Sequence, residues 1–129
     1  MGKPVSSNVE RVETTGLNTK VNKKVFEGFK DCCKYLGYPM NVMLETFMQQ
    51  YANGRFELSS EDILKWKGDK SETDILNSSF NKKIYLEFKS ACKSERYFVR
   101  HVITAFMEKV ATGNLILEYV NADEVKKNK

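Results

Sequence analysis

Residue types that often build special sites are scarce in this sequence of 129 residues, which has three cysteines, two prolines, one tryptophan and one histidine. The cysteines are an adjacent pair, Cys32 and Cys33, and the distant Cys92. An odd number with an adjacent pair does not form a disulfide framework, and no Cys-x-x-Cys motif is present. A zinc site needs four ligands within reach, which this spacing does not offer. We therefore expect reduced, mostly buried thiols and no metal.

Long apolar stretches are also missing. No run approaches the roughly 20 residues that cross a bilayer, and the first residues lack the apolar core of a signal peptide. The composition, 41% hydrophobic and 29% charged, is unlike that of a disordered chain. We expect a cytoplasmic protein without a membrane partner.

Residue patterns for catalysis are absent as well. The sequence shows no nucleophile–base pair, no carboxylate dyad and no glycine-rich phosphate loop. Its single histidine, His101, has the character of a surface or boundary residue rather than of a catalytic group. The prediction is a protein that is not an enzyme and that uses no cofactor.

Positive charge is gathered in two blocks. The net charge is +4, from 21 Lys and Arg against 17 Asp and Glu. Residues 17–58 carry +2 and residues 76–117 carry +4, whereas residues 59–75 between them carry −2. A moderately basic surface favours nucleic acid as a partner, although many other proteins share this balance.

The two basic blocks are copies of one unit. Residues 17–58 align with residues 76–117 without a gap, and 14 of the 42 columns are identical. Average residue usage would match roughly three such columns by chance. The identical pairs include Asn22 with Asn81, Phe29 with Phe88, and Phe47 with Phe106. We infer an internal duplication.

Each copy has the pattern of a strand followed by two helices. Residues 17–21 and 76–80 alternate between the two faces of a strand, and Asn22 and Asn81 then stand at a helix N-cap position. Gly37 ends the first helix of the first copy. The apolar stripe of the first helix comprises Val25, Phe29, Cys32 and Leu36 in one copy, and Ile84, Phe88 and Ala91 in the other.

One unit of about 40 residues has too little core and leaves its strand unpaired. The predicted fold is therefore mostly α with a short antiparallel β-ribbon, in which two strand-helix-helix repeats form an intramolecular pseudo-dimer. Exchange of halves between two chains is left open. The predicted segments are a flexible arm 1–16, repeat 1 at 17–58, an acidic linker 59–75, repeat 2 at 76–117, and a strand end and polar tail at 118–129. Within the linker, a short helix near residues 60–65 and packing of Trp66 on the bundle are expected.

The alternating strand, the polar step into the first helix and the Leu36-Gly37 turn resemble the ribbon-helix-helix family of DNA-binding proteins, the Arc, MetJ and CopG group. Two copies in one chain are similar to the tandem form of the TraY proteins of conjugative plasmids. The resemblance covers residues 17–117 and implies a ribbon that enters the DNA major groove. The second copy departs from the pattern, because Arg96 stands where the family has a turn glycine.

Four outward-facing strand residues, Asn18, Lys20, Asn77 and Ser79, are predicted to contact bases. A two-stranded ribbon fits the major groove, where Asn pairs with adenine and Lys donates to guanine. The alternative is that these residues form the solvated face of a half-buried hairpin. Because Lys20 aligns with Ser79, the two halves of the DNA site would differ.

Two further groups of residues are predicted to contact phosphates. Lys23-Lys24 and Lys82-Lys83 lie in a first helical turn, where the helix dipole disfavours cations by roughly 0.3–1 kcal/mol each. Their recurrence in both copies favours phosphate contacts, against the alternative of a solvated surface retained since the duplication. The resemblance adds the start of the second helix, whose N–H groups bind phosphate in the family. The matching residues here are Met40, Asn41, Val99 and Arg100, and Arg96 close by adds a side-chain donor.

The predicted function is sequence-specific binding of double-stranded DNA, as a transcriptional repressor or autoregulator. A plasmid accessory factor at a transfer origin or partition site would use the same surface and is the first alternative. A protein–protein adaptor or antitoxin-like module is the second. The expected partners are double-stranded DNA, further copies on adjacent sites, and a protein bound through the linker around Trp66. The expected location is the cytoplasm, at the nucleoid or a plasmid.

Overall fold

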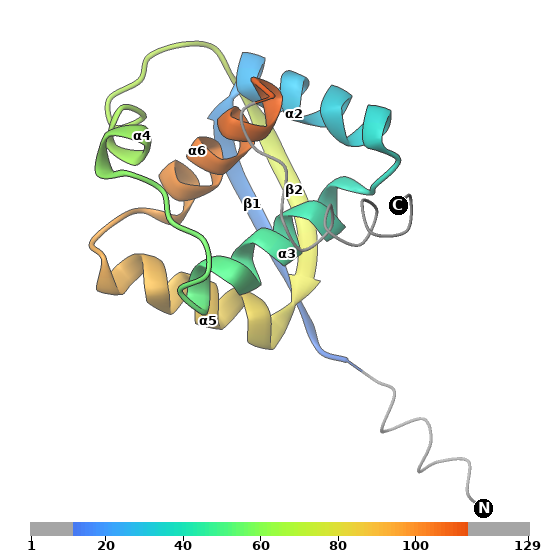
Figure 1. Ribbon diagram of the computed structural model, residues 1–129, viewed down its shortest axis with the longest axis vertical. Helices are drawn as coiled ribbons and strands as arrows, with labels where there is room; N and C mark the ends of the chain where they lie inside the picture. The colour runs from blue at the N-terminus through green and yellow to red at the C-terminus, as the bar shows by residue number, and fades with distance from the viewer. Residues whose placement is uncertain (1–11, 114–129) are drawn as a thin grey trace, which may run out of the picture.

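The chain forms two strands and five helices within the part that its structure describes. This structure is a computed structural model, and it describes residues 12–113. The elements in chain order (Figure 1) are β1 (Thr14–Asn22), α2 (Lys23–Leu36), α3 (Met40–Ala52), α4 (Ser60–Leu64), β2 (Thr73–Asn81), α5 (Lys82–Ser94) and α6 (Val99–Ala111). Among these described helices, none is long and apolar enough to cross a membrane.

The element order, β-α-α-α-β-α-α, shows that the predicted fold class was wrong. Two strand-helix-helix repeats forming an intramolecular pseudo-dimer do not account for α4. The segment predicted as an acidic linker, residues 59–75, supplies α4 and also the first residues of β2. Ile63 of α4 is fully buried, so this segment packs as part of the core. The coarser expectation of a mostly helical chain with a short antiparallel ribbon fits in part.

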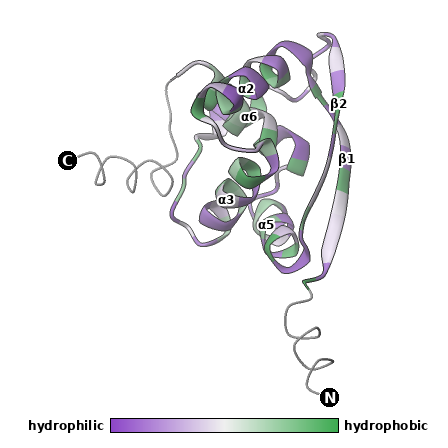
Figure 2. Ribbon diagram, turned by 90° about the vertical axis from the view of Figure 1, so that its right-hand side faces the viewer, coloured by the Kyte–Doolittle hydropathy of each residue, from purple (hydrophilic) through white to green (hydrophobic). Residues whose placement is uncertain are grey.

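The two strands pair antiparallel over their whole length. Thr14 lies opposite Asn81 at one end, and Asn22 lies opposite Thr73 at the other. Each strand begins three residues before its predicted start, because its partner strand continues to offer a hydrogen-bonding edge until the partner's helix begins. Figure 2 shows the ribbon along one edge of the molecule, with the helices on one side of it.

The first helix after each strand begins where the asparagines predict. The side-chain oxygen of Asn22 accepts a hydrogen bond from the N–H of Val25 at 3.0 Å, and that of Asn81 accepts one from the N–H of Ile84 at 3.0 Å. Each asparagine thereby satisfies a backbone donor that has no partner within the helix. Both N-cap predictions are confirmed.

The turns that follow these helices use a left-handed residue. Gly37 has φ 79° after α2, and Arg96 has φ 67° after α5. A non-glycine residue in this region costs roughly 1–2 kcal/mol, because its Cβ crowds the following carbonyl oxygen. The second turn is therefore made without the glycine that its conformation favours.

The core lies between the helices and the inner face of the ribbon. Helix α2 packs on α6, and α3 packs on α5. At the centre the rings of Phe47 and Phe106 stack, with centroids 4.2 Å apart and planes at 8°. Phe29 and Phe88 meet this pair edge-on, so four aromatic rings from four helices form one cluster.

The buried faces of α2 and α5 are displaced from the predicted apolar stripes. The buried side chains are Phe26, Phe29 and Cys33 in α2, and Tyr85, Phe88 and Cys92 in α5. Several stripe residues, including Val25, Cys32, Leu36 and Ile84, are only partly buried. The predicted stripes are thus the margin of a broader face, because each helix packs both on the ribbon and on another helix.

Helix α4 is held against α6 by ion pairs on its exposed side. Lys65 pairs with Glu108 at 2.8 Å, and Lys109 pairs with Asp62 at 3.0 Å. The following Trp66 is partly buried against the core, which confirms the prediction that it packs this segment on the bundle. Its indole nitrogen is buried without a hydrogen-bond partner among the described residues.

All three cysteines are free. Burial raises the pKa of Cys33 to about 11 and that of Cys92 to about 12, so both stay protonated at neutral pH. This confirms the expected reduced, mostly buried thiols. The predicted terminal strand end and tail at 118–129, and residues 1–11 of the predicted arm, lie outside the described residues.

Candidate nucleic-acid interface

The four residues predicted to contact bases all lie on the exposed face of the ribbon. Exposed positions alternate with partly or fully buried ones along both strands, as the sequence period predicts. Asn18 of β1 lies directly opposite Asn77 of β2, near the middle of the ribbon. Lys20 lies opposite Ile75, and Gly16 lies opposite Ser79. The structure therefore brings the four side chains together on one surface.

Besides Gly16, three further residues of this face were not among the predicted contacts. Ile75 is 52% exposed beside Lys20, although it is a large apolar side chain. Thr14 and Thr73 extend the exposed face at the two ends of the ribbon. The strand alternation was the signal for all three, but their types carry no charge or amide. An exposed Ile suits the methyl group of thymine.

The predicted lysine pairs stand at opposite ends of the ribbon. Lys23 follows the end of β1 and Lys82 follows the end of β2. Because each strand has nine residues, the two pairs are separated by about 30 Å at the usual strand rise. This arrangement places positive charge at both ends of the exposed ribbon face.

The first lysine of each pair has an acidic neighbour in the residue that precedes the other strand. Lys23 contacts Glu72 at 3.7 Å, and Lys82 contacts Glu13 at 3.8 Å. Pairs this exposed are worth roughly 0–1 kcal/mol and are screened by salt. Lys23 and Lys82 can therefore leave these carboxylates for a phosphate group. Lys24 and Lys83 are exposed and have no ion pair among the described residues.

The N-termini of α3 and α6 lack a side-chain cap, in contrast to α2 and α5. Their N-cap residues are Pro39 and Phe98, neither of which can accept a hydrogen bond through its side chain. The first two N–H groups of each helix, those of Met40 and Asn41 in α3 and of Val99 and Arg100 in α6, have no acceptor within residues 12–113. Such groups, with the helix dipole, form a favourable place for an anion.

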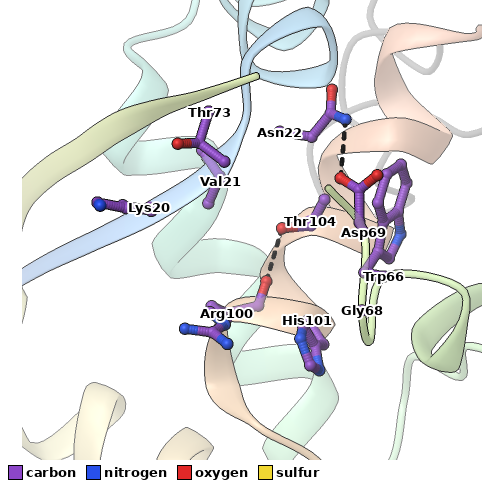
Figure 3. Close-up of a pocket in the computed structure, with 10 residues that line it drawn as sticks. All are labelled: Lys20, Val21, Asn22, Trp66, Gly68, Asp69, Thr73, Arg100, His101 and Thr104. Atoms are coloured by element: carbon purple, nitrogen blue, oxygen red, sulfur yellow. Dashed lines mark hydrogen bonds between the residues drawn. The ribbon is translucent and has the colours of Figure 1, made fainter. Parts of the chain in front are cut away.

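The start of α6 lies beside the ribbon. A cavity of about 270 Å³ is lined by Lys20 of β1, Arg100 of α6 and the loop around Asp69. Figure 3 shows the side chains of Lys20 and Arg100 extending toward the same side of this cavity. Asn22 donates to the carboxylate of Asp69 at 3.1 Å, which ties the loop to the end of β1. A predicted base contact and a predicted phosphate contact are thus neighbours.

The start of α3 has a different neighbourhood. Its groove is lined by Asn41, Val42, Glu45, Thr46 and Gln49, and none of these is basic. The carboxylate of Glu45 accepts a hydrogen bond from the N–H of Asn81 at 3.0 Å, so it is committed to the end of β2. The two helix starts thus present different charges beside the ribbon.

The expectation that His101 is a surface or boundary residue was wrong. Its side chain is only 7% exposed and lies against the ring of Phe98, with ring centroids 5.4 Å apart. Burial lowers the pKa of His101, and the nearby charges of Arg100 and Lys67 lower it further. Trp66 and Gly68, in the loop that follows α4, line the same cavity as His101, so this residue lies beside a segment that is distant in the sequence.

No group of His, Cys, Asp and Glu side chains within residues 12–113 could hold a metal ion. Comparisons with protein-family models, with curated proteins and with solved structures found no match. The case for a function therefore depends on the geometry of the ribbon and its surroundings.

Proposed function

We propose that this chain binds double-stranded DNA sequence-specifically, with the exposed face of the β1–β2 ribbon in the major groove. The observation that carries the proposal is the grouping of Asn18, Lys20, Asn77 and Ser79 on that one face. A two-stranded ribbon has the dimensions to enter the major groove, where all four base pairs can be distinguished.

Each side chain has a defined chemical task in this proposal. Asn18 and Asn77 pair with adenine through their amides, Lys20 donates to guanine, and Ser79 gives one weaker hydrogen bond. Ile75, opposite Lys20, adds an apolar contact for a thymine methyl group. The facing pair Lys20 and Ile75 in one half of the ribbon corresponds to the facing pair Ser79 and Gly16 in the other half. Because these side chains differ, the recognised sequence is asymmetric.

Contacts to phosphates hold the ribbon in place. In this proposal the lysine pairs at the ribbon ends and the uncapped starts of α3 and α6 contact the DNA backbones. Each phosphate that is neutralised releases counterions, so binding weakens as salt rises.

Such a protein acts by occupying its site, and we propose that it is a transcriptional repressor or autoregulator located at the nucleoid or a plasmid. The resemblance to ribbon-helix-helix proteins in residues 17–117 supports this proposal through the residues of the ribbon. A site at a transfer or partition origin, instead of a promoter, would favour the accessory-factor alternative.

The proposal is tested by selecting bound sequences from random duplex DNA at near-physiological salt. The wild-type protein is run beside Asn18→Ala/Lys20→Ala, which removes two ribbon side chains. We expect an asymmetric motif with the wild type, and a loss of about tenfold or more in affinity for that motif with the variant, since each good base contact discriminates by roughly 1–3 kcal/mol.

A matched control removes the same residue types far from the ribbon. Asn53→Ala/Lys34→Ala changes the end of α3 and the last turn of α2, and it should recover the wild-type motif. Enrichment of no sequence, or loss of the motif in both variants alike, would overturn the proposal.

A further inference from the structure

A groove at the junction of α5 and α6 carries a cluster of cations that the ribbon does not account for. Its volume is about 380 Å³. We call its lining residues the α5–α6 strip, which consists of Lys89, Lys93, Arg96, Tyr97, Phe98 and Val99. Three of the six are basic and none is acidic. Lys89 and Lys93 are four residues apart, so they project from the same side of α5.

The strip continues the candidate interface without a break. Arg100 lines the cavity beside Lys20 of the ribbon, and its guanidinium lies 5.9 Å from the ring centroid of Phe98. Phe98, which is 64% exposed, in turn lines the groove with Lys89 and Lys93. Cations are therefore present beside the ribbon, at the start of α6 and in the groove that α5 lines.

The corresponding surface beside α3 lacks this continuity. Residues 82–100 contain six basic and two acidic residues, whereas residues 23–41 contain four and two. Neither Arg96 nor Arg100 has a basic counterpart, since Gly37 and Asn41 stand in those places. Lys30, the counterpart of Lys89, lies over the ring of Phe26 at 4.4 Å from its centroid.

We propose that the α5–α6 strip binds the phosphates of DNA that flanks the recognised sequence, on the α6 side only. This inference rests on the proposed function, because the ribbon determines where the duplex lies. Lys89 and Lys93 add contacts beyond the start of α6, and the exposed ring of Phe98 lies between them and Arg100. The protein accordingly covers more DNA on one side of its site than on the other.

The test measures binding to duplexes that carry the selected motif with different flanks. One duplex ends close to the motif, two are lengthened on one side by about six base pairs, roughly 20 Å of helix, and one is lengthened on both sides. Affinities are measured by fluorescence anisotropy over a range of salt concentrations. The variants are Lys89→Ala/Lys93→Ala and, as a matched control, Lys30→Ala/Lys34→Ala, each checked for folding by thermal unfolding.

We expect lengthening on one of the two sides to tighten binding several-fold, and lengthening on the other side to change little. The duplex lengthened on both sides should bind no more tightly than the better of the two duplexes lengthened on one side. In Lys89→Ala/Lys93→Ala the gain disappears, the short duplex is bound as before, and the salt slope on the long duplex falls by about 1.8, at about 0.9 for each phosphate. The control variant keeps the gain.

Two different failures are distinguishable. Binding to the short duplex without any one-sided gain, or a gain that survives the loss of Lys89 and Lys93, overturns this inference and leaves the proposed function standing. An equal loss in the control variant also overturns it, since the strip would then have no special role. Absence of binding to every motif duplex overturns the proposed function and this inference together.

Discussion

At Arg96 the backbone conformation favours glycine, whereas the proposed function uses the charged side chain. Its backbone has φ 67°, a conformation that favours glycine, and the corresponding turn in the first half of the chain uses Gly37. Its side chain lines the basic groove at the start of α6. The conformational cost is thus tolerated at a position where the proposed function uses a cation.

Replacing this residue separates the two effects. Arg96→Gly relieves the left-handed strain, and part of the gain is offset by the greater freedom of glycine in the unfolded chain. We expect the free energy of unfolding to rise by roughly 0.5–1 kcal/mol in urea titrations, while DNA affinity falls. Gly37→Ala should instead lower stability. A destabilised Arg96→Gly protein would show that the side chain, not the backbone, dominates this turn.

We expect His101 to make the free energy of unfolding depend on pH. Because burial lowers its pKa, the folded protein keeps the imidazole neutral where the unfolded chain, with an ordinary value of about 6.5, takes up a proton. The free energy of unfolding should therefore fall as the pH is lowered from about 7 to about 5. His101→Leu should remove most of this fall in urea titrations at the two pH values.

Two carboxylates do not interfere in this range. Hydrogen bonds lower the pKa of Asp62, mainly through Lys109, and that of Asp69, mainly through Asn22. Their contributions are present above the ordinary carboxyl pKa and are lost only at more acidic pH, below about 4. An equal pH dependence in wild type and His101→Leu would exclude His101 as the cause.

At the scale of the elements, two asparagines decide where β1 and β2 end and where α2 and α5 begin. Removing either N-cap, as Asn22→Ala or Asn81→Ala, should cost about 1 kcal/mol of stability, since one backbone donor loses its acceptor. Asn22→Ala should cost more, because Asn22 also bonds Asp69. Chemical denaturation measures both, and serine at either position should restore most of the loss. Equal stability of Asn81→Ala and wild type would contradict the capping role.

At the scale of the whole molecule, α4 joins the segment between the two strands to the core. Ile63 is fully buried and α4 packs on α6, so Ile63→Ala should leave a cavity and cost roughly 2–5 kcal/mol in chemical denaturation. Leu64→Ala is the matched control, because Leu64 is 47% exposed and its loss should change little. If Ile63→Ala lowers the free energy of unfolding no more than Leu64→Ala does, the segment does not contribute to the core.

Local features of the fold could be predicted because nearby residues cause them. An asparagine caps a helix through a donor three residues away, and a strand alternates its faces whatever it packs against, so Asn22, Asn81 and the outward set around Asn18 and Asn77 were found. The same alternation turns Ile75 outward, but Ile75 was not among the predicted base contacts because its apolar side chain gave no chemical signal.

Features that depend on distant partners could not be predicted. His101 is buried beside Trp66 and Gly68, which come from the loop after α4 and are distant from it in the sequence. The extra strand residues Thr14 and Thr73 pair because the partner strand is still extended opposite them. The shift of the buried face of α2 toward Phe26 and Cys33 follows from packing on two elements at once.

The sequence by itself determined the capped helix starts, the exposed and buried faces of the strands, and the presence of basic residues in both halves, because each depends on the spacing of neighbours along the chain. Tertiary structure alone decided that Ile63 of α4 is fully buried in the core, that Lys20 and Arg100 line one cavity, and that Lys89 and Lys93 line a groove with the residues before α6. Those arrangements bring together residues from different elements, and the physical reason is that packing, not local preference, sets which surfaces meet.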